Sequence, residues 1–544
     1  MCYNKGMQIR DKLAEILGTK LEHPENEEWG DYAVFLKPGK EADKIIDKLK
    51  KLEFVEKVER VGGFVNIRLK DEFFSTLLSQ VIRDPEWGKS SVLRGKKVMV
   101  EFTDPNPFKE LHIGHLYSNS VGEAISRLFE ANGAKVARAC YQGDVGMHVA
   151  KAIYGLLRSK KSKVKTLTQK AKLLGEAYVL GAMAFEDNPE AAAEIKELNI
   201  KLYEAKSAEI MKLYQEGRRW SLLYFDKIYK RLGTKFDFHY FESGAAKDGL
   251  KVVEEGLKKG VFEKSEGAVV FKGEKYGLHT RVFVNSHGLP TYEAKELGLA
   301  PAKFADFPYD RSVIITGNDI NDYFRVLLKC LDILYPDLAK RTKHMSHGMV
   351  KLPGMAKMAS RKGNVLTAEW LLDEAKKKVL EIAPKATDAD AVGVAAIKYA
   401  MLRSGIGRDI EFDLDKSVSF EGSSGPYLQY TFARAQSVLR KSQTLNSKLQ
   451  KDLEFSVSNL EFNSEELAVL RWLSRWPEVV EEAGERLAPN LICGFIYELA
   501  QRFNSFYAKH TILDNGFRLA LTQATGQVLK MGLEMLGIKA LERM

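Results

Sequence analysis

Two histidines flank a glycine in the segment of this sequence that is best suited to chemistry, His112 and His115 with Gly114 between them. Their spacing lets both imidazoles face one ligand at the start of a helix. A helix N-terminus binds anions through its free backbone N–H groups and its positive dipole end, and a glycine lets the backbone approach a ligand closely. We therefore expect both histidines to donate hydrogen bonds to phosphate oxygens. The alternative is that they cap a turn in an ordinary α/β core.

A second candidate is Lys357, in the basic, glycine-containing segment 357–364 that precedes a helix expected near Thr367. A lysine on such a loop can reach a pyrophosphate and stabilise charge in a transition state. Judged alone, the segment also fits a solvated basic loop. No GxxxxGK[ST] or GxGxxG pattern is present, so any bound ATP needs the histidine turn instead.

The elements around the histidine turn follow from the hydrophobic pattern. The apolar run at 98–102 predicts a buried strand, and two prolines exclude helix directly after it. A helical pattern then runs from Gly114 to a C-cap at Asn132, and residues 135–139 predict the next strand. Strand, loop, helix and strand form a βαβ unit, which predicts a Rossmann-like parallel sheet with a right-handed crossover.

The remaining pattern predicts an α/β protein with helical additions. Residues 1–90 read as a small α+β unit, and residues 155–232 as an inserted helical subdomain. From Asp388 the chain reads as almost wholly helical. Three further strands are expected, at 267–271 and 280–284, joined by a hairpin-like turn, and at 312–316.

The bulk composition is that of a globular protein of several domains. The chain has 544 residues, 45% of them hydrophobic and 29% charged, and no apolar run long enough for a membrane span. The four cysteines form no CxxC pair, which argues against a zinc or disulfide framework. The N-terminus has no apolar signal region, so we expect a cytoplasmic protein. The net charge of +10 is consistent with a nucleic-acid partner, although many basic proteins bind none.

Together, the two candidate phosphate-binding segments resemble the HIGH and KMSKS signatures of class I aminoacyl-tRNA synthetases. The stretch from Glu101 to Gly146 resembles the arginyl-tRNA synthetase family in particular, and the similarity extends over nearly the whole chain. The resemblance implies an N-terminal tRNA-contacting domain at 1–90, a catalytic domain at 91–415 and an all-α anticodon-binding domain at 416–544. It also implies a monomer that uses ATP, phosphate-bound Mg²⁺ with no dedicated protein metal site, arginine and tRNA(Arg).

The resemblance also implies roles for single residues. The catalytic group would be His112, His115, Lys109 and Lys357, and Gly114 and Asp319 would join His112, His115 and Lys357 in binding ATP. Arginine would contact Glu101, Asn106, Asp144, Tyr292 and Glu296; Tyr292 and Glu296 lie one helical turn apart and can face one ligand. Without the family context, that pair could equally be a surface pair. The expected tRNA contacts are Phe64, Asn66, Gln429, Tyr430, Arg434, Tyr507 and Arg518.

The chain departs from the family pattern in two places. In the second signature, Ala359 replaces the usual serine and Ser360 takes the second lysine position, where Arg361 or Lys362 could serve instead. Glu296 stands where the family usually has aspartate. Two other enzyme classes stay open at this point: another class I synthetase, and a small-molecule nucleotidylyltransferase with an HxGH site.

Overall fold

A computed structural model describes residues 9–19, 21–159, 164–351, 366–445 and 462–544. Its contacts divide the chain into two compact units. One contains residues 1–87, 434–477 and 498–529, and the other contains residues 88–433, 478–497 and 530–544. Each unit is described by itself below.

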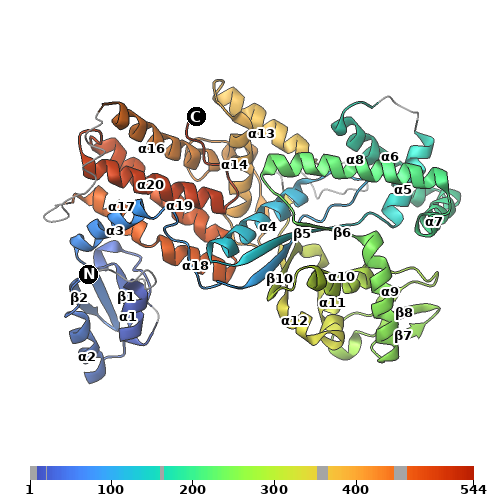
Figure 1. Ribbon diagram of the computed structural model, residues 1–544, viewed down its shortest axis with the longest axis horizontal. Helices are drawn as coiled ribbons and strands as arrows, with labels where there is room; N and C mark the ends of the chain where they lie inside the picture. The colour runs from blue at the N-terminus through green and yellow to red at the C-terminus, as the bar shows by residue number, and fades with distance from the viewer. Residues whose placement is uncertain (1–8, 20, 160–163, 352–365, 446–461) are drawn as a thin grey trace. The chain divides into compact units, whose positions relative to one another are not determined.

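The larger unit is built on a five-stranded parallel sheet in the order β11-β10-β4-β5-β6 (Figure 1). Its strands are β4 (Lys97–Glu101), β5 (Lys135–Gln142), β6 (Phe238–Phe241), β10 (Arg311–Gly317) and β11 (Thr342–His347). Helix α4 (Ile113–Ala131) connects β4 to β5 and ends at Asn132, which confirms the predicted βαβ unit.

The two faces of this sheet are covered by different helices. The ring of Phe102 packs so closely on Gly122 of α4 that a Cβ there would lie 2.1 Å from it. On the other face, Met99, Ala137 and Ala139 pack with Phe304 and Phe307, which lie at the end of α10 (Tyr292–Asp306). Figure 1 shows α4 and α10 on opposite sides of the strands.

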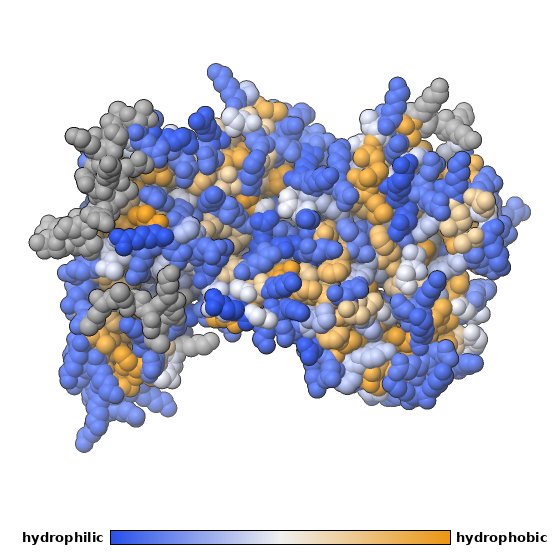
Figure 2. Space-filling model, in the orientation of Figure 1, coloured by the Kyte–Doolittle hydropathy of each residue, from blue (hydrophilic) through white to orange (hydrophobic). Residues whose placement is uncertain are grey.

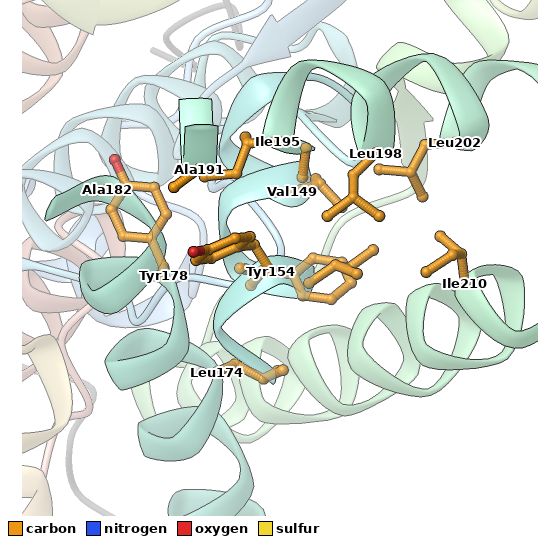
Figure 3. Close-up of a cluster of buried hydrophobic side chains, with 14 residues drawn as sticks. Val149, Tyr154, Leu174, Tyr178, Ala182, Ala191, Ile195, Leu198, Leu202 and Ile210 are labelled. Carbon is orange, nitrogen blue, oxygen red and sulfur yellow. The ribbon is translucent and has the colours of Figure 1, made fainter. Parts of the chain in front are cut away.

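The predicted helical insertion lies between β5 and β6. It follows α5 (Met147–Arg158) and consists of α6 (Leu167–Asp187), α7 (Pro189–Glu204) and α8 (Ala208–Leu232). Figure 3 shows its core, where side chains such as Tyr154, Ile195 and Leu198 point toward one another. This core also takes in Phe108 from the loop before α4, so the insertion is packed onto the predicted phosphate site.

Further elements of the larger unit extend this framework. The predicted hairpin is confirmed as β8 (Ala268–Phe271) paired antiparallel with β9 (Arg281–Val284), with β7 (Glu263–Ser265) beside β8. The short strands β12 (Val350–Lys351) and β13 (Ile410–Glu411) pair in parallel. The other helices are α9 (Glu242–Lys258), α11 (Asn321–Leu334), α12 (Pro336–Arg341), α13 (Ala368–Ile382), α14 (Ala389–Leu402) and α15 (Leu414–Ser417).

The smaller unit contains the predicted N-terminal α+β fold. Helices α1 (Ile9–Leu17), α2 (Lys40–Leu49) and α3 (Asp71–Arg83) accompany an antiparallel sheet in the order β1-β3-β2. Its strands are β1 (Tyr32–Phe35), β2 (Val55–Val61) and β3 (Phe64–Leu69). Hydrophobic surface, drawn in orange in Figure 2, gathers over this part of the chain, where Phe35, Val61 and Phe64 are exposed.

The predicted helical C-terminal region is confirmed. It contains α16 (Gly425–Leu445), α17 (Ser464–Ser474), α18 (Trp476–Arg486), α19 (Pro489–Lys509) and α20 (Gly516–Met535). Helices α16, α18, α19 and α20 each contribute residues to both units. None of the helices within the described ranges is both long and apolar enough to cross a membrane.

Candidate active site

The loop between β4 and α4 is held in an unusual backbone conformation. Thr103, Asp104 and Phe108 have φ angles of 79°, 43° and 69°, a region that residues other than glycine seldom occupy. Hydrogen bonds fix each of these residues: Thr103 N donates to Ser118 Oγ (3.0 Å), Asp104 Oδ1 accepts from Tyr141 N (2.8 Å), and Phe108 N donates to Ser221 Oγ (2.9 Å). Strained loops that the surrounding structure holds in place cluster at functional sites.

The two histidines at the end of this loop cap the first turn of α4. His112 Nδ1 accepts from Gly114 N (3.1 Å), and His115 Nδ1 accepts from His112 N (3.0 Å). Because both Nδ1 atoms accept, each neutral ring carries its proton on Nε2. The rings stack with centroids 3.8 Å apart. Two parallel N–H donors are thereby provided at a helix N-terminus.

Both imidazoles are kept neutral. Burial, followed by the charge of Lys109, lowers the pKa of His112 to about 4. Burial and then the neighbouring His112 lower the pKa of His115 well below its usual value. A neutral imidazole still donates a hydrogen bond from Nε2. Two such donors at a helix N-terminus suit a ligand whose negative charge grows during the reaction.

Charged side chains from other elements surround the histidine turn. Lys109 extends from the strained loop over the ring of Tyr178, with 4.3 Å between Nζ and the ring centroid. The exposed Asp319 lies in the 3-10 turn η3 (Asn318–Ile320) after β10, and its charge raises the pKa of His112. Asp319 therefore acts on the same imidazole as Lys109, with opposite sign.

The chain on both sides of the second candidate segment is attached to this turn. Thr367 and His112 form an isolated antiparallel β-bridge. Beside it, Ile113 N donates to Leu366 O (3.3 Å), and Ala368 N donates to Leu111 O (2.7 Å). On the other side, β12 packs against α4. Lys357, Ala359, Ser360, Arg361 and Lys362 themselves lie outside the described residues.

Buried carboxylates gather at the carboxyl ends of β4 and β6, on the α10 side of the sheet. Glu101 ends β4 and pairs with Lys303 at 2.7 Å, and Glu242 follows β6 and pairs with Lys295 at 2.7 Å. Glu296 has no cation partner among the residues that the structure describes. Burial and then the charge of Glu101 raise its pKa to about 8. The carboxyl groups gathered here, with Asp104 among them, outnumber the two lysines, so a cationic ligand would stabilise the ionised form of Glu296.

Two of the predicted arginine-contacting residues, Asn106 and Tyr292, are not held in an ion pair by any described residue. Asn106 belongs with the cluster: a Cβ on Gly143 would lie 2.2 Å from Asn106 Oδ1 and 2.9 Å from Glu242 Oε1. Tyr292 opens α10 and is half exposed, with Lys295 Nζ 5.2 Å from its ring centroid.

Asp144, by contrast, is already saturated by protein donors. Its carboxylate accepts from Tyr214 Oη, from Arg218 Nε at 2.9 Å, and from both the backbone N and Oγ of Ser243. It therefore ties the insertion to α9 and has little capacity left for a ligand. Glu101 is likewise paired with Lys303, so its oxygens are not wholly available for the role that the resemblance implies.

Sequence reasoning missed Glu242, although it lies beside Asn106 and Gly143. A usable signal existed, because Glu242 directly follows a strand, and the carboxyl ends of parallel strands meet at one edge of a sheet, where ligands bind. Glu242 could not be assigned to the site from the sequence, because residues 238–241 were not predicted to be a strand of this sheet.

The predicted tRNA-contacting residues are partly exposed and partly buried. Phe64 and Tyr430 are exposed, and Tyr507 is exposed at 39% with the Arg434 guanidinium 4.9 Å from its ring centroid. Three others are buried or bonded within the protein. Asn66 is buried in β3, Gln429 is buried and donates to Lys539 O, and Arg518 pairs with Glu466 at 2.7 Å.

No metal site is evident in the part of the chain that the structure describes, where no group of three or more His, Cys, Asp or Glu side chains is arranged to hold an ion. Cys140, Cys330 and Cys493 are buried free thiols.

Comparisons with known proteins agree with this geometry. Residues 77–414 match the family described as tRNA synthetases class I (R), catalytic domain, and residues 428–544 match the DALR anticodon binding domain. An arginine–tRNA ligase of Treponema denticola is 33% identical, covering 96% of this chain and 94% of the relative. One of Porphyromonas gingivalis is 31% identical, covering 90% and 88%.

Solved structures share the fold. The arginyl-tRNA synthetase of Thermus thermophilus superposes with a TM-score of 0.78 at 24% identity, covering 98% of this chain and 99% of that chain. The Plasmodium falciparum enzyme gives a TM-score of 0.77 at 19% identity. From its two family matches and its curated relatives, this chain belongs to the arginyl-tRNA synthetase family of class I.

Proposed function

We propose that this chain is an ATP-dependent ligase that joins L-arginine to tRNA(Arg). The observation that carries the substrate assignment is Glu296, a buried carboxylate without a described cation partner, in a cluster next to a strained loop that ends in two neutral imidazoles. Arginine is a permanent cation with five N–H donors, and it supplies the missing charge. The match of residues 428–544 to an anticodon binding domain supports this reading over a small-molecule nucleotidylyltransferase.

In the first step, the carboxylate oxygen of arginine attacks the α-phosphorus of ATP. The new P–O bond gives arginyl-adenylate, and the bond to the β-phosphate breaks to release pyrophosphate. We assign His112 and His115 to the phosphate oxygens through Nε2–H, with Gly114 allowing close backbone approach. Lys109 and Lys357 would add positive charge. Asp319, as a carboxylate, suits the ribose hydroxyls of ATP better than its phosphates.

In the second step, the 2′-hydroxyl of the terminal adenosine of the tRNA attacks the carbonyl carbon of the adenylate. The ester bond forms as AMP leaves with the electron pair, and the hydroxyl proton is lost to the leaving phosphate or to solvent. Neither step needs a protein nucleophile, so positioning and charge stabilisation provide the catalysis. Mg²⁺, held by phosphate oxygens, would neutralise charge on the triphosphate.

On the arginine side, we assign Glu296 and Tyr292 to the guanidinium group and Asn106 to the backbone end of the amino acid. Glu101 and Glu242 are each paired with a lysine, which leaves Glu296 as the carboxyl group for the substrate cation. Asp144 stays a weaker candidate for the arginine site, because Tyr214, Arg218 and Ser243 already donate to its oxygens.

A charging assay tests the proposed function. The purified chain is incubated with ATP, total tRNA and each of the twenty amino acids in turn, and aminoacylated tRNA is measured. Arginine alone should be attached. Attachment of a different amino acid, or none with active tRNA present, would overturn the proposal.

Arginine binding should strengthen as the pH rises from 7 to 9. The pKa of Glu296 is about 8 in the free protein, and a bound guanidinium favours the ionised form, so binding releases a proton. The ionised fraction grows from about a tenth to about nine tenths over this range, and the Michaelis constant for arginine should fall about tenfold. In Glu296→Gln, this part of the pH dependence should vanish; an unchanged profile in that variant would remove Glu296 as its source.

For tRNA, we propose that Phe64, Tyr430, Arg434 and Tyr507 contribute contacts, since aromatic rings and arginine planes stack on unpaired bases. We leave Gln429, Asn66 and Arg518 as weaker candidates because of their engagement within the protein. The division into segments 1–90, 91–415 and 416–544 is likewise proposed as a division of function: tRNA contact, catalysis and anticodon recognition.

Replacing Tyr507 with alanine should raise the Michaelis constant for tRNA about tenfold, the loss expected for one stacked base. The turnover number should stay within about twofold of wild type. Tyr276→Ala is a matched control, because that tyrosine is equally exposed, at 41%, and lies outside the proposed tRNA-contacting set. Equal effects of the two substitutions would contradict the assignment.

A further inference from the structure

The strand register places Tyr141 on the same side of the sheet as the carboxylate cluster. It lies near the carboxyl end of β5, two residues beyond Ala139, which pairs in register with Glu101 of β4. Side chains alternate along a strand. Ala139 faces the α10 side of the sheet, so Tyr141 faces that side too, as does Glu101 with its partner Lys303.

The hydroxyl of Tyr141 is buried and has no hydrogen-bond partner within the described part of the chain. Its pKa is raised well above the usual value, first by burial and then by the charges of Glu242 on α9 and Glu296 on α10. Tyr323 of α11 raises this pKa further, but its own hydroxyl donates to Tyr292 O. A buried hydroxyl without a partner is unfavourable, and a ligand bound beside the acidic groups could complete its bonding.

We propose that the Tyr141 hydroxyl is a specificity-determining contact to the guanidinium group of arginine, accepting one of its N–H donors beside Glu296. This inference rests on the proposed function and adds a residue to its arginine site. A guanidinium presents five N–H donors and has no acceptor. Glu101 and Glu242 already accept hydrogen bonds from Lys303 and Lys295. The uncharged oxygen of Tyr141 provides one more acceptor without adding negative charge.

The substitution Tyr141→Phe tests this inference, because it removes only the hydroxyl and keeps the ring. The Michaelis constants for arginine and ATP and the turnover number are measured by ATP–pyrophosphate exchange with tRNA present. Loss of one hydrogen bond to a charged group should raise the arginine constant about tenfold or more. The ATP constant should stay within about twofold of wild type.

Tyr240→Phe provides the matched control. Tyr240 is the register partner of Tyr141 on β6, and its hydroxyl is also buried, but the acidic residue with the largest effect on its pKa is Asp306. Both constants should stay within about twofold in this variant, and both variants should melt at similar temperatures.

Each alternative outcome is informative. An arginine constant within twofold of wild type in Tyr141→Phe, or equal rises in both constants, would overturn the inference while leaving the proposed function intact. If the wild-type protein fails to exchange or charge with arginine, the proposed function itself fails. A rise confined to arginine, absent from Tyr240→Phe, supports the contact.

Discussion

Replacing His115 with alanine should slow arginine-dependent ATP–pyrophosphate exchange by about two to three orders of magnitude, the usual loss for one donor to a developing negative charge. His115 holds its Nδ1 against the backbone N of His112, so its Nε2–H is fixed in direction. Its lowered pKa keeps the ring neutral at the working pH. The affinity for tRNA should change little, because the side chain acts at the phosphates.

Two amide substitutions distinguish the roles of the two ring nitrogens of His115. Asparagine can replace the Nδ1 acceptor but not the distant donor, whereas glutamine can place an N–H near the Nε2 position. Exchange should therefore be faster in His115→Gln than in His115→Asn. His287→Ala, at an exposed histidine outside the site, serves as the control and should behave as wild type. Unchanged exchange in His115→Ala would remove the histidine turn from the mechanism.

The second large effect is expected at Glu296. Removing one partner of a buried charge pair costs about 2–5 kcal/mol, so Glu296→Ala should raise the Michaelis constant for arginine by about a hundredfold or more. The constant for ATP should change only a few-fold. Steady-state exchange kinetics with each substrate varied in turn measure both, and equal rises in the two constants would contradict the assignment.

Melting temperatures of a second variant, Glu296→Gln, would separate a loss of arginine binding from a loss of folding. The pKa of Glu296 is raised from 4.5 to about 8 in the folded protein, so the folded state resists its ionisation, and stability falls as the pH rises between these values. Glu296→Gln removes this cost and should raise the melting temperature at pH 8 while binding of arginine weakens. Glu293→Ala is the control, because Glu293 lies on the same helix but pairs with Arg281 at 3.6 Å. It should leave the arginine constant near wild type.

Local patterns in the sequence predicted the elements that place the phosphate site. The strand at 98–102, the helix after Gly114 and the strand at 135–139 are set by nearby apolar residues, prolines and a cap, and all three are present. The hairpin of β8 and β9 and the helical insertion were predictable for the same reason.

The partners of individual side chains were much harder to predict. Asp144 has the right chemistry for an arginine site, but Tyr214, Arg218 and Ser243 occupy its oxygens. The side chain of Gln429 likewise donates to the backbone O of Lys539, which is distant in sequence. Residue type and spacing show which groups can bond, whereas the tertiary fold decides which of them are already bonded.

The most direct test is a crystal structure of this protein with a non-hydrolysable arginyl-adenylate analogue. We expect the guanidinium group against the Glu296 carboxylate and the phosphate oxygens within hydrogen-bond distance of Nε2 of His112 and His115. A guanidinium group in solvent, or a phosphate held away from both imidazoles, would contradict the account.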